Sequence, residues 1–213
     1  KFLNKNFTCV AVSKTKSEKS IKKLYDFGYR HFGENKVQEL IIKNKGLPKD
    51  IHWHMIGHLQ TNKVKMIVPF VYLIHSVDSL KVLSKINRES EKIGKKTNCL
   101  IQINISNEES KYGFSINEIK DIFINNDLNN FNSIIIKGLM GMASFSDDKL
   151  LIKSEFKNLK NLYELIKNNF ERNNNNIDFD TLSMGMSNDY EIALNEGSNM
   201  VRIGSLLFGK RNY

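Results

Sequence analysis

The residue of this chain whose position most clearly suggests a chemical role is Lys14, which directly follows an apolar, β-branched run at residues 7–13. A lysine at the end of a buried strand is partly removed from water, which lowers its pKa and makes its amine nucleophilic toward a carbonyl. The chemistry that this arrangement favours is formation of a Schiff base. The chain is rich in lysine, however, and an ordinary solvated residue is the simpler interpretation of Lys14 taken alone.

Two turns near the C-terminus contain glycine and serine and could hold a phosphate. The first, residues 183–187, ends in Ser187, which we expect to be the N-cap of the helix that follows. The second, residues 202–205, contains Gly204, which lets the backbone approach a ligand, and Ser205, which offers another hydroxyl. A single pair of this kind usually marks only a turn. Two of them on adjacent strands, near a helix N-terminus, favour a phosphate site.

Other polar residues are expected at strand ends and would describe a pocket without defining a mechanism. They are Gly33-Glu34-Asn35, His54, Gly57-His58 and Ser76. His54 can equally be a core histidine with its hydrogen bonds satisfied. Met140 and Met142 are interpreted as packing residues.

These candidates need a scaffold that brings strand ends together, and the hydrophobic pattern supplies one. Short apolar runs alternate with amphipathic segments, which is typical of a parallel α/β protein. The predicted strands cover residues 7–13, 31–34, 51–57, 72–77, 98–105, 133–142, 180–184 and 200–204. The predicted helices cover residues 17–28, 36–45, 61–68, 79–93, 116–124, 149–170 and 188–195. Eight strands in this alternation predict a (β/α)8 TIM barrel rather than an open doubly wound sheet, with the candidates at its mouth.

Composition narrows the function classes. The net charge of +9 could indicate nucleic acid, but no arginine-rich stripe or zinc-finger spacing accompanies it, so we expect no nucleic-acid partner. Cys9 and Cys99 lie far apart in apolar runs, which disfavours a disulfide or a metal site. No apolar run is long enough to span a membrane and no signal peptide precedes the first strand, so we expect a soluble cytoplasmic protein. With two prolines and no visible linker, residues 1–213 are expected to form one domain.

Several motifs occur in a characteristic order along the chain. They are Ala11-Val12-Ser13-Lys14-Thr15-Lys16, Phe32-Gly33-Glu34-Asn35, Trp53-His54-Met55-Ile56-Gly57-His58-Leu59-Gln60-Thr61-Asn62-Lys63, Gly138-Leu139-Met140-Gly141-Met142, Ser183-Met184-Gly185-Met186-Ser187 and Arg202-Ile203-Gly204-Ser205. Together they resemble the pyridoxal 5′-phosphate (PLP) homeostasis protein family, also called proline synthetase co-transcribed homologues. The resemblance extends over residues 7–213 and implies a fold type III barrel like the N-terminal domain of alanine racemase.

The resemblance also implies a role for each matching residue. Lys14 would carry PLP as a Schiff base, and Arg202 would face the pyridine nitrogen. The remaining implied contacts are Ser187, Gly204 and Ser205 on the phosphate, Asn35 along the ring, and Met184 packed near it. Lys111, on the loop after the fifth strand, would help the cofactor enter or leave. Ser205 departs from the threonine that the family usually has, and it keeps the hydroxyl.

These assignments bear on whether the protein is an enzyme. PLP enzymes that form carbanions usually pair the pyridine nitrogen with a carboxylate, whereas Arg202 would leave that nitrogen unprotonated. Racemisation then remains, but it needs a second base, which the resembling racemases take from another domain and subunit. We therefore predict a monomeric, non-catalytic PLP carrier that maintains intracellular PLP homeostasis, with apo PLP-dependent enzymes as candidate recipients. The alternatives are a slow amino-acid racemase and a basic RNA- or protein-binding module built on a barrel.

Overall fold

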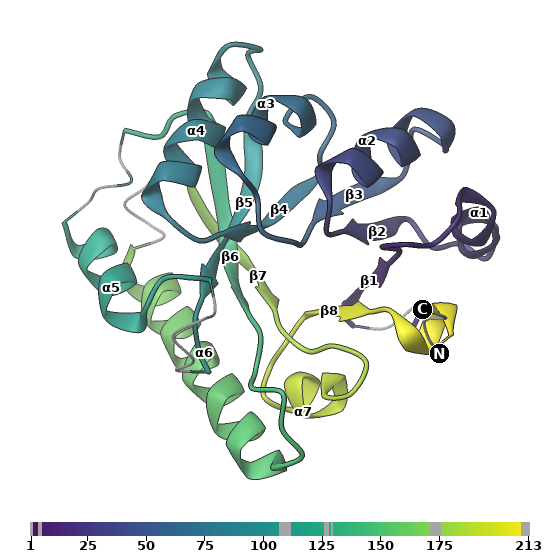
Figure 1. Cartoon of the computed structure of the whole chain (residues 1–213). Helices are drawn as coiled ribbons and strands as arrows, with labels where there is room; N and C mark the ends of the chain where they lie inside the picture. Colours follow the sequence, from purple (N-terminus) through teal and green to yellow (C-terminus); the bar gives the residue numbers. More distant parts are fainter. Residues whose placement is uncertain are drawn as a thin grey trace.

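The central feature of the fold is a closed ring of parallel strands (Figure 1). The computed structural model describes residues 2–3, 6–106, 112–125, 128, 130–170 and 176–209. In these ranges eight strands pair in sequence order, and β1 also pairs with β8 to close the barrel. They are β1 Thr8–Val12, β2 His31–Glu34, β3 His52–Met55, β4 Leu73–Val77, β5 Thr97–Ile103, β6 Ile134–Gly141, β7 Ile177–Ser183 and β8 Met200–Ile203. The predicted TIM barrel is confirmed.

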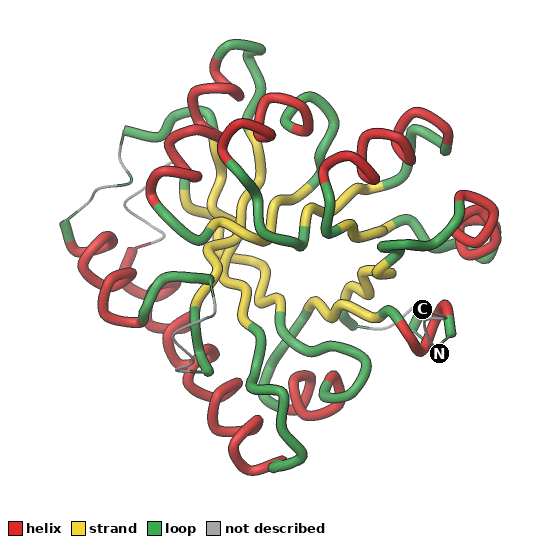
Figure 2. Tube along the Cα trace, in the orientation of Figure 1, coloured by secondary structure: helices red, strands yellow, loops and turns green. Residues whose placement is uncertain are grey.

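The helices lie outside the ring of strands (Figure 2). They are α1 Glu18–Asp26, α2 Val37–Gly46, the 3-10 turn η1 Thr61–Lys63 with α3 Val64–Ile67, α4 Leu80–Glu91, α5 Ile116–Ile124, α6 Lys149–Phe170, α7 Tyr190–Asn195 and α8 Ser205–Phe208. Helix α8 follows the last strand and was not predicted. The segment predicted as one helix at residues 61–68 is instead a 3-10 turn followed by a single α-helical turn.

Local sequence explains where several helices begin. The hydroxyls of Ser17, Ser79 and Ser115 each accept a hydrogen bond from an N–H of the first turn that follows. Ser115 also forms a capping box, in which Glu118 accepts the N–H of Ser115 at 2.7 Å. Such caps satisfy donors that the helix itself leaves unpaired, so they fix the loops that leave each strand end.

The core has two parts with different chemistry. The large apolar cluster fills the space between strands and helices, and it includes Trp53, Phe156 and Phe179. A smaller cluster of Val10, Leu73, Leu100, Met140 and Met200 is separate from it. Strands β4 and β8 are buried along their whole length, as expected for parallel strands covered on both faces. Their buried polar residues, among them His75 and Arg202, are therefore shielded from solvent.

Cys9 and Cys99 are both free and buried. Burial raises the pKa of the Cys9 thiol to about 12, and it raises that of Cys99 as well. Neither is therefore a reactive thiolate near neutral pH. Among the described residues, no helix combines the length and the hydropathy that a membrane crossing needs.

Candidate functional site

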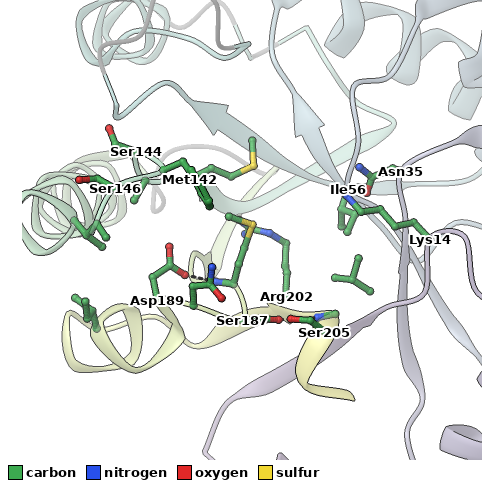
Figure 3. A pocket seen from close by; sticks show the side chains of 18 of the residues that line it. Lys14, Asn35, Ile56, Met142, Ser144, Ser146, Ser187, Asp189, Arg202 and Ser205 are labelled. Carbon is green, nitrogen blue, oxygen red and sulfur yellow. Dashed lines mark hydrogen bonds between the residues drawn. The ribbon is translucent and has the colours of Figure 1, made fainter. Parts of the chain in front are cut away.

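A cavity of about 490 Å³ lies at the C-terminal ends of the strands, where working sites of such barrels are found (Figure 3). It is large enough for a small organic ligand. The predicted residues that line it come from β1, β2, β7 and β8 and the loops that follow them: Lys14, Asn35, Ser187, Arg202, Gly204 and Ser205. Residues far apart in the sequence thus meet around one space, as the barrel predicted.

Met184 does not line this cavity. Its side chain is fully buried in the apolar cluster beneath the helices. Side chains alternate along a strand, and the preceding Ser183 faces the barrel interior, so Met184 faces the other way. The methionines that line the cavity are Met142, interpreted from sequence as a packing residue, and Met186.

The two turns that were predicted to hold a phosphate are arranged differently from the prediction, although both reach the cavity. Ser187 is not the N-cap of α7, because Asp189 occupies that position. The carbonyl of Met186 accepts the N–H groups of Asp189 and Tyr190, and this extra turn places Ser187 ahead of the helix. The Ser187 hydroxyl instead accepts the N–H of Gly204 at 3.2 Å, which joins the two turns.

Ser205 begins the unpredicted helix α8, with Gly204 as its N-cap. The first N–H groups of a helix have no partner within it and suit an anion. The sequence does carry a signal for this helix, since an apolar run over residues 206–208 ends at Gly209, where the backbone has a positive φ of 76°. The run is too short for a helical period to show in the sequence.

Arg202 reaches the cavity from inside the barrel and is 4% exposed. Its Nη1 donates to the carbonyl and the hydroxyl of Ser183, at 2.8 and 2.7 Å, and its Nη2 donates to the carbonyl of Gly141 at 2.9 Å. Burial lowers the pKa of Arg202 to about 10, so the side chain stays charged at neutral pH. Because a guanidinium has only donors, a ring nitrogen beside it must act as an acceptor.

A chain of imidazoles continues from this arginine through the barrel interior. The Ser183 hydroxyl contacts His75 Nδ1 at 3.1 Å, His75 Nε2 contacts His54 Nδ1 at 2.8 Å, and His54 Nε2 contacts His31 Nδ1 at 2.9 Å. The chain ends with His52, whose Nδ1 lies 3.4 Å from His31 Nε2. His54 is thus a core histidine with its hydrogen bonds satisfied, which confirms that interpretation.

These imidazoles are held neutral. Burial lowers the pKa of His54 and of His75 well below the ordinary value of 6.5. The neighbouring histidines add to this effect at His54, and Arg202 and His31 add to it at His75. Burial also lowers the pKa of His31 to about 4. The imidazoles between Ser183 and His31 are therefore hydrogen-bonded and uncharged at neutral pH.

The polar strand ends contribute less to the cavity than expected. Of Gly33-Glu34-Asn35, only Asn35 lines it, while Glu34 and Ser76 are fully buried. Ser76 lies within β4 rather than after it. Met140 packs in the smaller core cluster, as interpreted from sequence. Lys111 lies outside the described residues.

The chain matches the family model for the alanine racemase N-terminal domain over residues 2–212. The pyridoxal phosphate homeostasis protein of Helicobacter pylori is 40% identical over 201 residues, which cover 93% of this chain and 86% of the relative. The human pyridoxal phosphate homeostasis protein is 39% identical over 215 residues, covering 96% of this chain and 76% of the relative.

Solved structures agree with these relatives. The structure of PipY from Synechococcus elongatus with PLP bound has a TM-score of 0.85 and 29% identity, covering 97% of this chain and 94% of PipY. An alanine racemase of Clostridium difficile has a TM-score of 0.75 at 17% identity and covers 100% of this chain and 54% of the racemase. The racemase likeness shows the shared barrel fold alone.

Proposed function

The chain belongs to the pyridoxal phosphate homeostasis proteins of the alanine racemase N-terminal domain family, and from this premise we propose that it binds PLP through Lys14 and carries or buffers the cofactor. The observation that supports this most directly is the single cavity around which Lys14, Arg202 and the two linked serine turns are gathered. We further propose that residues 1–213 form one domain and that the carrier is cytoplasmic and monomeric. Apo PLP-dependent enzymes would take the cofactor from it.

The residues around the cavity fit PLP chemically. The hydroxyls of Ser187 and Ser205 and the start of α8 offer donors to a phosphate. Lys14 offers a primary amine, and when PLP is bound its aldehyde supplies the electrophile with which that amine condenses as a Schiff base. Arg202 offers only donors toward the ring nitrogen. Asn35 lines the same wall as Lys14 in Figure 3 and would contact the ring.

The choice between a carrier and a racemase depends on a second acid or base. Arg202 would keep a facing pyridine nitrogen unprotonated, which weakens the electron sink that most carbanion chemistry needs and leaves racemisation as the alternative. Racemisation also requires an acid or base on each face of the substrate. Among the described residues that line the cavity, the acids and bases besides Lys14 and Arg202 are Lys16, Asp147, Lys149 and Asp189, and there is no tyrosine, histidine or cysteine. Of these four, Lys16 already donates to the carbonyl of Phe208 and Asp189 accepts the N–H of Met186, which favours the carrier.

Solvent deuterium exchange tests this choice. We expect the PLP-loaded protein to be yellow, to be fixed by borohydride, and to incorporate no deuterium at the α-carbon of alanine on the timescale of enzyme turnover. Incorporation measured by NMR or mass spectrometry at about 1 s⁻¹ or faster, near the lower end of ordinary turnover, would establish the racemase instead. A colourless protein that borohydride does not label would contradict both PLP functions.

A second experiment tests the phosphate end. The double variant Ser187→Ala with Ser205→Ala should weaken PLP at least about tenfold, because each hydrogen bond to a charged oxygen contributes on the order of 1.5–3 kcal/mol. Affinity for pyridoxal, which lacks the phosphate, should barely change in a fluorescence titration.

The matched control is Ser146→Ala, which removes another hydroxyl that lines the cavity but lies away from the two linked turns. This variant should bind PLP as the wild type does. Equal weakening of PLP and pyridoxal in the double variant would move the phosphate to another part of the cavity.

A further inference from the structure

The backbone that carries Lys14 has an unfavourable conformation. Lys14 and Thr15 are the central residues of a turn that the Lys16 N–H closes on the Ser13 carbonyl at 3.0 Å. Thr15 has a φ of 65°, and among the described residues no other non-glycine residue has a positive φ. A β-branched side chain disfavours this region strongly. Surrounding contacts must therefore hold the turn.

Two charged side chains of α2 form hydrogen bonds to the backbone of the turn, one on either side of Lys14. The Glu39 carboxylate accepts the N–H of Thr15 through Oε2 at 2.9 Å. The Lys43 ammonium donates to the carbonyl of Ser13 at 2.9 Å. The residues before and after Lys14 are thus both fixed to one helix.

Lys43 is the centre of a buried cluster. Besides Ser13, it donates to Glu34 Oε1 at 2.7 Å and to Glu39 Oε2 at 3.3 Å, so each of its three N–H groups has an acceptor. The Ser13 hydroxyl also donates to Glu34 Oε1, at 2.6 Å. The side chain of Lys43 is 7% exposed and that of Glu34 is fully buried. The hydrogen bonds of Lys43 therefore go to the turn itself, at Ser13, and to Glu34 and Glu39, which in turn accept hydrogen bonds from Ser13 and Thr15.

Stability alone does not account for this cluster. Buried ion pairs rarely stabilise a fold more than apolar residues of similar size would. In addition, Glu34 Oε2 has no hydrogen-bond partner within the described part of the chain, and burial raises the pKa of Glu34. For Glu39, burial would raise the pKa, but the Thr15 N–H and Lys43 lower it overall, so this carboxylate stays ionised and keeps its hold on the turn.

We propose that Glu34, Glu39 and Lys43 are positioning residues that hold the Lys14 turn in the geometry from which its amine attacks an aldehyde. This inference rests on the proposed function. The reaction that they favour is a condensation, in which the Lys14 nitrogen and the aldehyde carbon form a C=N bond and one water molecule leaves, with no oxidation or reduction. Fixing the nucleophile beside the bound carbonyl makes this step effectively unimolecular.

The experiment separates condensation from binding. Titration with PLP reports both binding and condensation. Titration with pyridoxine 5′-phosphate, which has a hydroxymethyl group in place of the aldehyde, reports binding alone. In Glu39→Ala we expect the rate constant of the absorbance change with PLP to fall about tenfold, as for loss of one hydrogen bond to a charged acceptor. The affinity for pyridoxine 5′-phosphate should stay within about twofold of the wild type, since the phosphate contacts are untouched.

A second substitution tests the cause. Glycine adopts a positive φ without strain, so adding Thr15→Gly to Glu39→Ala should restore most of the lost rate. The matched control is Glu118→Ala, which removes another glutamate that accepts a backbone N–H, on α5. Its condensation rate should equal that of the wild type.

Three results would overturn the proposal. They are an unchanged condensation rate in Glu39→Ala, an equal loss of affinity for both ligands, and no recovery on adding Thr15→Gly. Failure of the proposed function itself shows differently, because the wild type would then give no absorbance change with PLP at all.

Discussion

Lys14→Ala is expected to abolish both the absorbance change on PLP addition and the borohydride-dependent attachment of the cofactor. The change removes the primary amine that the cavity presents from the end of β1, and a Schiff base cannot form without it. PLP should still bind reversibly through its phosphate, because Ser187 and Ser205 are unaffected. Spectroscopy with mass spectrometry of the reduced protein measures both effects.

Lys16→Ala is the matched control, because Lys16 lines the same cavity but donates to the carbonyl of Phe208 at 3.2 Å. Its spectrum should match that of the wild type. Both variants should keep a cooperative thermal transition, since neither side chain is packed in the core. Borohydride labelling of Lys16 or Lys149 in the wild type would show that the nucleophile was assigned wrongly.

The second large effect concerns acid stability. His54 and His75 are neutral in the folded protein but titrate near the ordinary value of 6.5 once the chain unfolds. Their pKa values are lower in the folded state, so the unfolded state binds more protons below about pH 6.5 and stability is lost as the pH falls. These two groups alone should lower the free energy of unfolding by roughly 4 kcal/mol between about pH 7 and pH 5. His31, whose pKa is lowered to about 4, adds to this loss. Urea unfolding across this range measures it.

The control variant is compared by how steeply its free energy of unfolding changes with pH and not by the free energy at any one pH. His54→Gln should lower stability at every pH, but its free energy of unfolding should fall less steeply between these pH values, because one proton-binding group has gone while His75 and His31 remain. Most carboxylates titrate below this range, so they contribute little to the difference. Identical slopes in the wild type and the variant would mean that His54 already carries a proton in the folded state.

The sequence predicted the barrel well because its signals are local. Strand β2 and helices α5 and α6 have the predicted bounds, and the other strands differ by a few residues at their ends. An apolar run bounded by polar turns needs no knowledge of its neighbours to be recognised as a strand. The same is true of the turns that place Lys14, Ser187 and Gly204 at the cavity.

What sequence could not supply was register. His52 and His54 lie two residues apart on one strand, and pairing places them opposite His31 and Gly33 of β2. A shift of one residue would turn the histidines to the other face, so the imidazole chain follows from pairing that no single segment encodes. The contacts of Lys43 with Glu34 and Ser13 were hidden for the same reason, since they join different elements.

The imidazole chain also has a direction. The Arg202 guanidinium only donates hydrogen bonds, so the Ser183 hydroxyl oxygen accepts one from it. All polar groups of Ser183 are then paired if its hydroxyl donates a hydrogen bond to His75 Nδ1. His75 then carries its proton on Nε2 and donates a hydrogen bond to His54 Nδ1. In the same way, His54 Nε2 donates to His31 Nδ1. Each ring in the chain therefore has one favoured tautomer, and the hydrogen bonds from β7 through β4 and β3 to β2 all point the same way, away from the Arg202 guanidinium.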